Sequence, residues 1–207
     1  MKTVLLSSIV IACTLLGARA FFYGEEEGNG VGTQKGQQEV PLVSQNFATK
    51  VINELNDRLN GSLVASYVYL SMAYWFDRAD MALPGFHKYF LAASHKARNE
   101  AEAIMKYINR RGGYIRLKNL KSPITVWRDG LKAMEYALGM EKDLNKNMLK
   151  THTVASNDPH VTHFLEDRFL ETKVDVIKEL GEYVTRLKSF TKDYSLGEYI
   201  LDKDLHD

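Results

Sequence analysis

Hydrophobic residues recur every three to four positions along four long stretches of the chain, with polar residues between them. This spacing is typical of an amphipathic α-helix, which buries one apolar stripe and exposes the opposite face. The stripes run from Leu55 to Phe76, Phe86 to Tyr107, Trp127 to Met148 and Leu170 to Leu187. A shorter stretch, from Leu196 to Leu205, indicates a fifth helix. Since the sequence shows no convincing strand-like alternation, we predict an all-α fold.

Prolines and glycines mark where these helices begin and end. Pro84 and the pair Asp158-Pro159 suit the first turns of the second and fourth helices, because a first turn leaves its N–H groups without helical partners. Gly112-Gly113 suits the end of the second helix. A short connection joins the first two helices, and about a dozen residues join the second to the third, which is typical of a crossover. The pattern therefore predicts a four-helix bundle with one long crossover and a short fifth C-terminal helix.

The first twenty residues have a different character. Lys2 precedes an apolar run from Val4 to Leu16, and Ala18-Arg19-Ala20 has the small-residue pattern of a signal-peptidase site. We expect residues 1–20 to be a signal peptide, so that the protein is secreted or held in the lumen of the secretory pathway. Residues 21–42 are interpreted as a flexible N-terminal extension, and residues 43–207 as the bundle domain.

Composition narrows the classes of partner. The 207-residue chain has 27 Lys and Arg against 26 Asp and Glu, a balance that argues against a nucleic-acid partner, because a phosphate backbone needs a basic face. The apolar run near the N-terminus is too short to span a bilayer, and no later run is longer, so we expect no membrane partner. The single cysteine, Cys13, lies in the predicted signal peptide, which leaves no disulfide or thiolate ligand in the mature chain.

Three charged residues interrupt the apolar stripes. Glu100, Glu141 and Lys173 fall in phase with buried positions, where an unpaired charge would be very unfavourable, so each needs a partner. In one interpretation the carboxylates hold iron inside the bundle. In the other, Lys173 forms a buried ion pair with Glu100 and Glu141. The second is favoured, since a protonated lysine cannot ligate a metal and its charge lies where a cation would lie.

Four segments carry a specific resemblance to a known family: residues 59–77 (LNGSLVASYVYLSMAYWFD), 109–113 (NRRGG), 157–160 (NDPH) and 196–202 (LGEYILD). From about Val43 to its C-terminus, the chain resembles the ferritins. The resemblance implies a ferritin-like bundle of the diiron type and a hollow, twenty-four-subunit shell. Such a shell receives iron as Fe²⁺ and stores it as a ferric mineral, without an organic cofactor.

The resemblance also shows where a heavy-chain ferritin binds the iron that it oxidises. The ligands are a glutamate on the first helix, a glutamate and a histidine three residues apart on the second, a glutamate on the third and a glutamine on the fourth. At the matching positions this chain has Ser62, Ala97, Glu100, Glu141 and Lys173. With so few ligands left, we expect a light-chain-type subunit that is not itself an enzyme and relies on a heavy-chain-type partner.

Two alternatives stay open. The first is a residual ferroxidase that uses Glu100, Glu141 and the retained first-helix tyrosine, Tyr69. The second is a secreted bundle that acts as a carrier or signal and has no mineral role.

Light-chain ferritins also offer carboxylates on the cavity side of the second helix for mineral nucleation, and here only Glu102 matches them. We therefore treat Glu102 as a weak remnant of a metal site.

The resemblance implies two channels through the shell. At the three-fold channel the matching residues are His163 and Glu166, one turn apart, with His152 nearby. Because a histidine replaces one of two acidic residues, the channel should attract cations more weakly and with a dependence on pH. At the four-fold pore the matching residues are Leu196, Ile200 and Asp204; outside a shell, Leu196, Ile200 and Leu201 would merely dock the tail helix.

One further motif is a candidate for modification. Asn60-Gly61-Ser62 is the only N-x-S/T sequon in the chain, and the predicted secretory route makes glycosylation of Asn60 possible. The sequon lies within the predicted first helix, on or beside its buried stripe.

Overall fold

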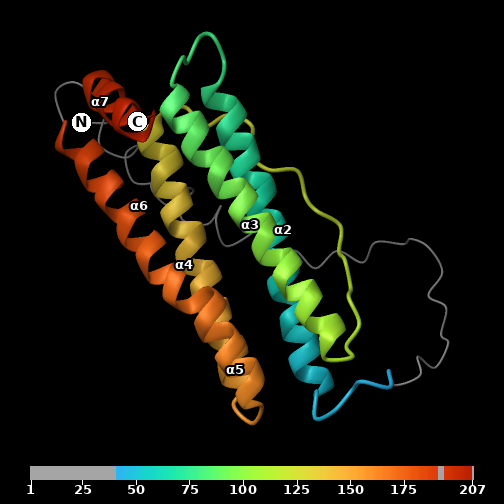
Figure 1. Cartoon of the computed structure of the whole chain (residues 1–207). Coiled ribbons are helices and arrows are strands. Elements are labelled where there is room, and N and C mark those ends of the chain that lie inside the picture. The colour runs from blue at the N-terminus through green and yellow to red at the C-terminus, as the bar shows by residue number, and fades with distance from the viewer. Residues whose placement is uncertain (1–40, 191–193, 207) are drawn as a thin grey trace, which may run out of the picture. The chain divides into compact units, whose positions relative to one another are not determined.

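The computed structural model describes residues 41–190 and 194–206, and within these residues it is built of helices joined by loops (Figure 1). The helices are α2 (Thr49–Phe76), α3 (Pro84–Arg110), α4 (Gly130–Val154), α5 (Pro159–Leu165), the π-helical turn η1 (Glu166–Leu170), α6 (Glu171–Ser189) and α7 (Tyr194–His206). Because α5, η1 and α6 follow one another without a break, they form the fourth long helix. The predicted all-α fold, four long helices and a short fifth, is confirmed. The predicted signal peptide and nearly all of the predicted extension lie outside the described residues.

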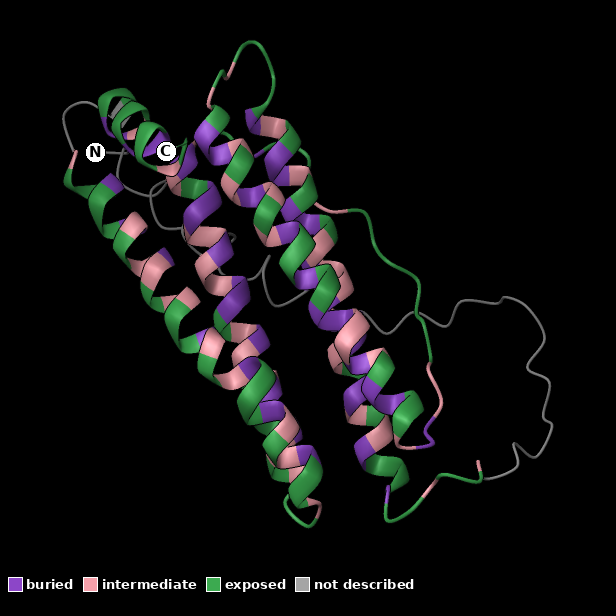
Figure 2. Ribbon diagram, in the orientation of Figure 1, coloured by how far each residue is buried: buried purple, intermediate pink, exposed green. Residues whose placement is uncertain are grey.

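The long helices form two pairs. α2 packs along α3, and α4 packs along α6, while α7 lies across one end of the bundle against α3 and α6 (Figure 1). Buried residues turn inward between the pairs, as Figure 2 shows. Near the α7 end the core is aromatic: the ring centroid of Phe76 lies 5.1 Å from that of Phe86 and 5.7 Å from that of Phe90. The apolar stripes predicted for the first two helices are thus the surfaces that pair them.

The third long helix begins later than its stripe suggested. It starts at Gly130, where the Asp129 carboxylate accepts a hydrogen bond from the Lys132 backbone N–H at 2.7 Å. The crossover therefore runs from residue 111 to residue 129, and the expected length of about a dozen residues was wrong. The cause is Trp127, which is buried in the crossover, with its indole N–H donating to Ser71 Oγ at 3.1 Å. A buried loop residue in phase with the helix extended the apparent stripe.

Two asparagines one turn apart on α2 hold the crossover. Asn56 Nδ2 donates to the Tyr114 carbonyl at 2.9 Å, and its Oδ1 accepts from the Arg116 N–H at 2.5 Å. Asn60 repeats the pattern, since its Nδ2 donates to the Arg116 carbonyl at 2.8 Å and its Oδ1 accepts from the Lys118 N–H at 2.8 Å. Both amides thus bond every second residue of an extended segment, which satisfies backbone groups that a loop leaves unpaired.

These hydrogen bonds affect whether the N-x-S/T sequon at Asn60 can be glycosylated. Asn60 is only 6% exposed, and its Nδ2 also donates to the Asn56 carbonyl at 2.7 Å. A glycan would be attached to Nδ2, the same nitrogen that makes both of these hydrogen bonds. The folded bundle therefore disfavours a sugar at Asn60.

Two carboxylates of α7 cap the first turns of two other helices. Asp202 is buried, and its Oδ1 accepts from the Phe86 N–H of α3 at 3.0 Å, while Glu198 accepts from the Gly130 N–H of α4. Only glycine fits at position 85, because a Cβ there would lie 1.8 Å from the Asp202 carbonyl oxygen. The tail helix is thereby fixed to the N-termini of α3 and α4.

Candidate functional site

The Lys173 ammonium lies at the middle of the bundle between two carboxylates. Its Nζ is 3.1 Å from each carboxylate oxygen of Glu100, on α3, and 2.9 Å from Oε2 of Glu141, on α4. An ammonium has three N–H donors, and these three oxygens can accept all of them. The side chains of Lys173, Glu100 and Glu141 are 5%, 9% and 5% exposed. Of the two interpretations left open by the sequence, this geometry is that of the buried ion pair.

The first long helix joins the cluster through Tyr69. Its hydroxyl donates to Glu141 Oε1 at 2.7 Å, and its ring stacks on that of Phe90 with centroids 6.2 Å apart. Glu141 therefore accepts from Tyr69 with one oxygen and from Lys173 with the other. Because α2, α3, α4 and α6 each contribute one member, the four residues tie the two helix pairs together.

Burial and charge decide the protonation states. Burial raises the pKa of the Glu100 carboxyl, an effect that the Lys173 ammonium only partly reverses. Burial by itself would lower the pKa of Lys173, but the carboxylates of Glu141 and Glu100 outweigh it and raise that pKa, so the amine stays protonated. Burial, together with Glu141, raises the pKa of Tyr69 well above its usual range, which keeps the phenol a hydrogen-bond donor.

The arrangement leaves little for a metal ion. Both oxygens of Glu100 face the ammonium, and both oxygens of Glu141 already accept hydrogen bonds. The positions that would carry further ligands hold Ser62 and Ala97, which are buried but offer at most one hydroxyl. In the described part of the chain, no group of three His, Cys, Asp or Glu residues is placed to hold a metal.

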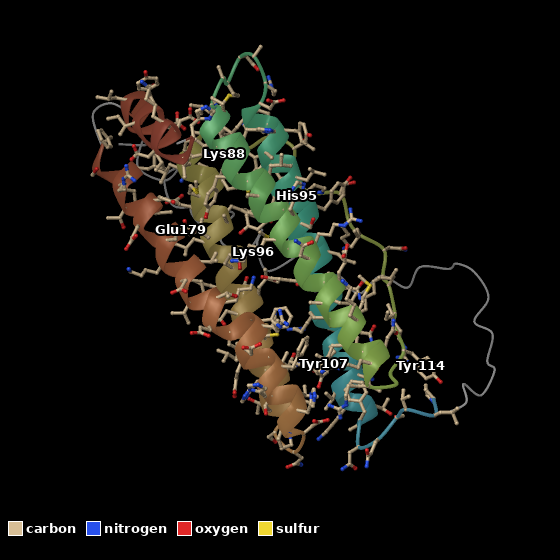
Figure 3. All side chains as sticks on the ribbon, in the orientation of Figure 1. Lys88, His95, Lys96, Tyr107, Tyr114 and Glu179 are labelled. Atoms are coloured by element: carbon tan, nitrogen blue, oxygen red, sulfur yellow. The ribbon has the colours of Figure 1, made fainter. Side chains whose placement is uncertain are left out.

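A cavity of about 180 Å³ adjoins the cluster between α3 and α6. Ala93 and Ala97 line it from α3, and Lys96 of α3 and Glu179 of α6 lie on its two sides (Figure 3). Glu179 accepts from the hydroxyls of Tyr89, at 3.3 Å, and Tyr183, at 3.0 Å. The small alanine side chains thus leave space beside Lys173 where larger residues could be accommodated.

The remaining candidates lie apart from this cluster. Glu102 pairs with Arg98 at 3.2 Å on the surface of α3 and does not join Glu100 and Glu141. His152 Nε2 lies 2.6 Å from Glu166 Oε1, so the structure brings these two predicted channel residues together. The third, His163, is exposed on α5 and lines a different hollow, beside α3.

The predicted pore residues of α7 divide into two groups. Leu196 and Ile200 are 46% and 36% exposed, and Asp204 pairs with Arg186 of α6. Leu201 is buried and anchors the tail helix. Leu196 and Ile200 therefore each leave part of their apolar surface exposed.

Sequence comparison decides the family. Residues 52–190 match the family model of the ferritin-like domain. The chain is also 46% identical over 168 residues to the soma ferritin of Lymnaea stagnalis, a match that covers 80% of this chain and 95% of that relative. This chain belongs to the ferritin family. Membership supports a role in iron storage, iron binding and assembly into a shell of several subunits. Over the described residues, this ferritin has no helix that is long and apolar enough to cross a membrane.

Sequence reasoning placed the charged members of the cluster but missed its surroundings. The hydrogen bond from Tyr69 to Glu141 joins residues 72 positions apart, and nothing in either helix alone signals it. The Glu179–Tyr183 contact does have a signal, since the two residues are four apart and share a helix face. The hydrogen bonds from Asn56 and Asn60 to the crossover were missed as well, because the sequence pattern draws attention to Asn60 only as a sequon and to Asn56 not at all.

We expect Glu100→Gln to change how the stability of this ferritin depends on pH. The folded pKa of Glu100 lies above its ordinary value of 4.5, so the folded state binds the proton more tightly than the unfolded state does. That contribution to stability is present below pH 4.5 and is lost as pH rises through the folded pKa. The free energy of unfolding of the native chain should therefore fall, relative to Glu100→Gln, as pH rises above 4.5.

Urea denaturation at several pH values measures this difference. Glu102→Gln is the matched control, because it removes a carboxylate two residues away that lies outside the cluster. Parallel curves for the native chain and Glu100→Gln would show that burial of Glu100 does not govern its protonation.

Proposed function

We propose that this chain is a light-chain-type ferritin subunit that helps to store ferric mineral and does not itself oxidise Fe²⁺. The supporting observation is the Lys173 ammonium, held within 3.1 Å of Glu100 and 2.9 Å of Glu141. Glu141 is the carboxylate kept from the heavy-chain pattern, and Glu100 stands where that pattern has a histidine. Iron would enter as Fe²⁺ and remain as Fe³⁺ mineral inside a twenty-four-subunit shell.

Electrostatics supports this proposal. A divalent ion 4 Å from an ammonium is repelled by about 8 kcal/mol at an effective dielectric constant of about 20, which cancels the attraction of one carboxylate at the same distance. Iron would also need several oxygen or nitrogen ligands, whereas the carboxylate oxygens here already accept hydrogen bonds. Displacing Lys173 would leave its own charge buried without a partner. The cluster therefore excludes the ion from the bundle interior.

The proposal extends to a partner and a compartment. A subunit without its own oxidation centre needs a heavy-chain-type ferritin subunit in the same shell to supply Fe³⁺. The Ala18-Arg19-Ala20 motif after an apolar run supports entry into the secretory pathway, so we place the assembled shell in the secretory lumen or outside the cell.

The test is a ferrous oxidation assay on residues 21–207, purified and sized before use. Fe²⁺ is added without oxygen, air is admitted, and the formation of Fe³⁺ is followed by absorbance. We expect a large assembly whose oxidation rate equals that of Fe²⁺ in buffer, and rapid mineral formation once a heavy-chain-type subunit is co-assembled. Oxidation well above the buffer rate by the chain alone would refute the proposal.

A residual ferroxidase is the second candidate, because Glu100, Glu141 and Tyr69 still converge on one point. If that were the activity, Glu141→Ala would slow Fe²⁺ oxidation. An unchanged rate in Glu141→Ala would eliminate this candidate.

A further inference from the structure

A second and larger hollow, of about 610 Å³, lies between α3 and the α5–η1 segment. Its walls include three cationic side chains, Lys106, Arg110 and Arg168, and two histidines, His160 and His163. None of them belongs to the Lys173 cluster or lines the cavity beside it. So many nitrogen donors around one hollow call for a negatively charged occupant.

The acidic residues of the same hollow neutralise it only in part. Glu102 is paired with Arg98 at 3.2 Å, and Asp167 with Arg168 at 3.5 Å. No ion pair of the described residues involves Lys106 or Arg110. These two cations are four residues apart on α3, where like charges repel each other on one helix face. An anion bound between them would remove that repulsion.

The floor of the hollow is held rigidly. The rings of Tyr107 and Phe164 stack with centroids 3.9 Å apart, so that Tyr107 bridges α3 and α5 (Figure 3). Arg111 Nη1 donates to the Tyr107 hydroxyl at 2.8 Å, and His160 Nδ1 lies 2.9 Å from the same oxygen. His160 Nε2 in turn lies 3.4 Å from Arg110 Nη2. Arg110 and His160 therefore lie beside the fixed aromatic surface of Tyr107 and Phe164.

The opposite wall is the π-helical turn. η1 supplies Asp167 and Arg168, which line the hollow together with Lys106 and Arg110 of α3. π-helical turns are rare and occur frequently at functional sites, because the wider turn re-aims side chains at some expense in helix stability. Arg168 gains only a 3.5 Å contact with the neighbouring Asp167, which leaves its guanidinium able to bond a ligand.

We propose that this hollow binds a phosphate group, either as inorganic phosphate or as a phosphate ester, through Lys106, Arg110 and Arg168. Guanidinium groups bond two phosphate oxygens at once, and an ammonium adds a compact positive charge. The hollow is of the size of small-molecule sites and exceeds what a free phosphate needs. An ester could place its organic part on the Tyr107–Phe164 surface. The proposal does not depend on whether the chain oxidises iron.

Isothermal titration calorimetry on the assembled, iron-free protein at low ionic strength tests it, with inorganic phosphate and phenyl phosphate as probes. We expect saturable binding of one probe per subunit. The double variant Lys106→Gln/Arg110→Gln should lose about tenfold in affinity or more, because two charge-assisted contacts are removed. Lys178→Gln, an exposed lysine of α6 paired with Glu182, is the control for charge alone.

A variant that is expected to bind phosphate more tightly completes the test. Asp167→Asn releases Arg168 from the carboxylate that it contacts at 3.5 Å and should tighten phosphate binding several-fold. Tighter binding of phenyl phosphate than of phosphate would identify an ester as the natural occupant, and equal affinities would identify the free anion. No saturable binding, or equal losses in the double variant and in Lys178→Gln, would overturn the proposal. Since Lys106 and Arg110 are exposed, their replacement should leave the bundle folded, which circular dichroism checks.

Discussion

Lys173→Met should lower the free energy of unfolding by about 3–5 kcal/mol, because methionine fills the space of lysine but leaves Glu100 and Glu141 buried without a counter-charge. Two carboxylates would then face each other in a low-dielectric interior, and Glu141 would keep only its hydrogen bond from Tyr69. Chemical denaturation and the melting temperature of the assembled protein both measure the loss. An unchanged melting temperature would contradict the charge cluster described here.

Removing the whole cluster should behave differently. The combination of Lys173→Met with Glu100→Leu and Glu141→Leu eliminates all three charges, and replacing a buried ion cluster by apolar residues of similar volume is often neutral or stabilising. Tyr69→Phe completes the set, since the phenol would otherwise lose its acceptor. Lys178→Met, on the exposed face of α6, is the control for a lysine that is not buried. The quadruple variant should therefore be more stable than Lys173→Met alone.

The second large effect is a gain of activity. Ser62→Glu, Ala97→Glu, Glu100→His and Lys173→Gln together supply the ligand types of the heavy-chain pattern, with Glu141 already present. All of these positions are buried, and the cavity beside Ala97 gives room for a longer side chain. The variant with these four substitutions should oxidise Fe²⁺ at least about tenfold faster than the native chain, because it gains ligands and loses a repelling charge.

Two controls separate the effect of the added ligands from the effect of removing the Lys173 charge. Lys173→Gln alone removes the ammonium without adding ligands, and we expect it to raise the rate only slightly. Adding Glu141→Gln to the four substitutions should abolish the gain. If the variant with these four substitutions assembled and still oxidised Fe²⁺ at the native rate, the loss of ligands would not explain the inactivity that we propose. Stopped-flow absorbance of the Fe³⁺ product makes the comparison.

Periodicity was sufficient to predict the members of the charge cluster. Glu100, Glu141 and Lys173 are in phase with the apolar stripes, and a helix places every residue of a stripe on the same side. Periodicity does not give the axial position of one helix relative to its neighbour. The hydrogen bond between Tyr69 and Glu141 could therefore be found only from the structure.

The crossover shows where such reasoning fails. Its position depends on Asn56 and Asn60, whose amides bond an extended segment about sixty residues later in the chain. Such contacts join a helix to a loop and leave no repeating pattern in either. Trp127 made the third helix seem to begin too early for a related reason, since a loop can bury a residue as completely as a helix does.

The π-helical turn has a consequence for the charge at the centre of the molecule. Val161, Leu165, Phe169 and Lys173 are all buried and are spaced four residues apart. In a regular α-helix, with 3.6 residues per turn, each such step would drift by about 40°, and three steps by about 120°. The wider turn at Glu166–Leu170 absorbs this drift. If the same residues formed a regular α-helix instead, α6 would be rotated by about 100° relative to α5. Lys173 would then turn out of the interior, leaving Glu100 and Glu141 free to meet a metal ion, so the length of one turn helps to decide whether this subunit excludes iron from its core.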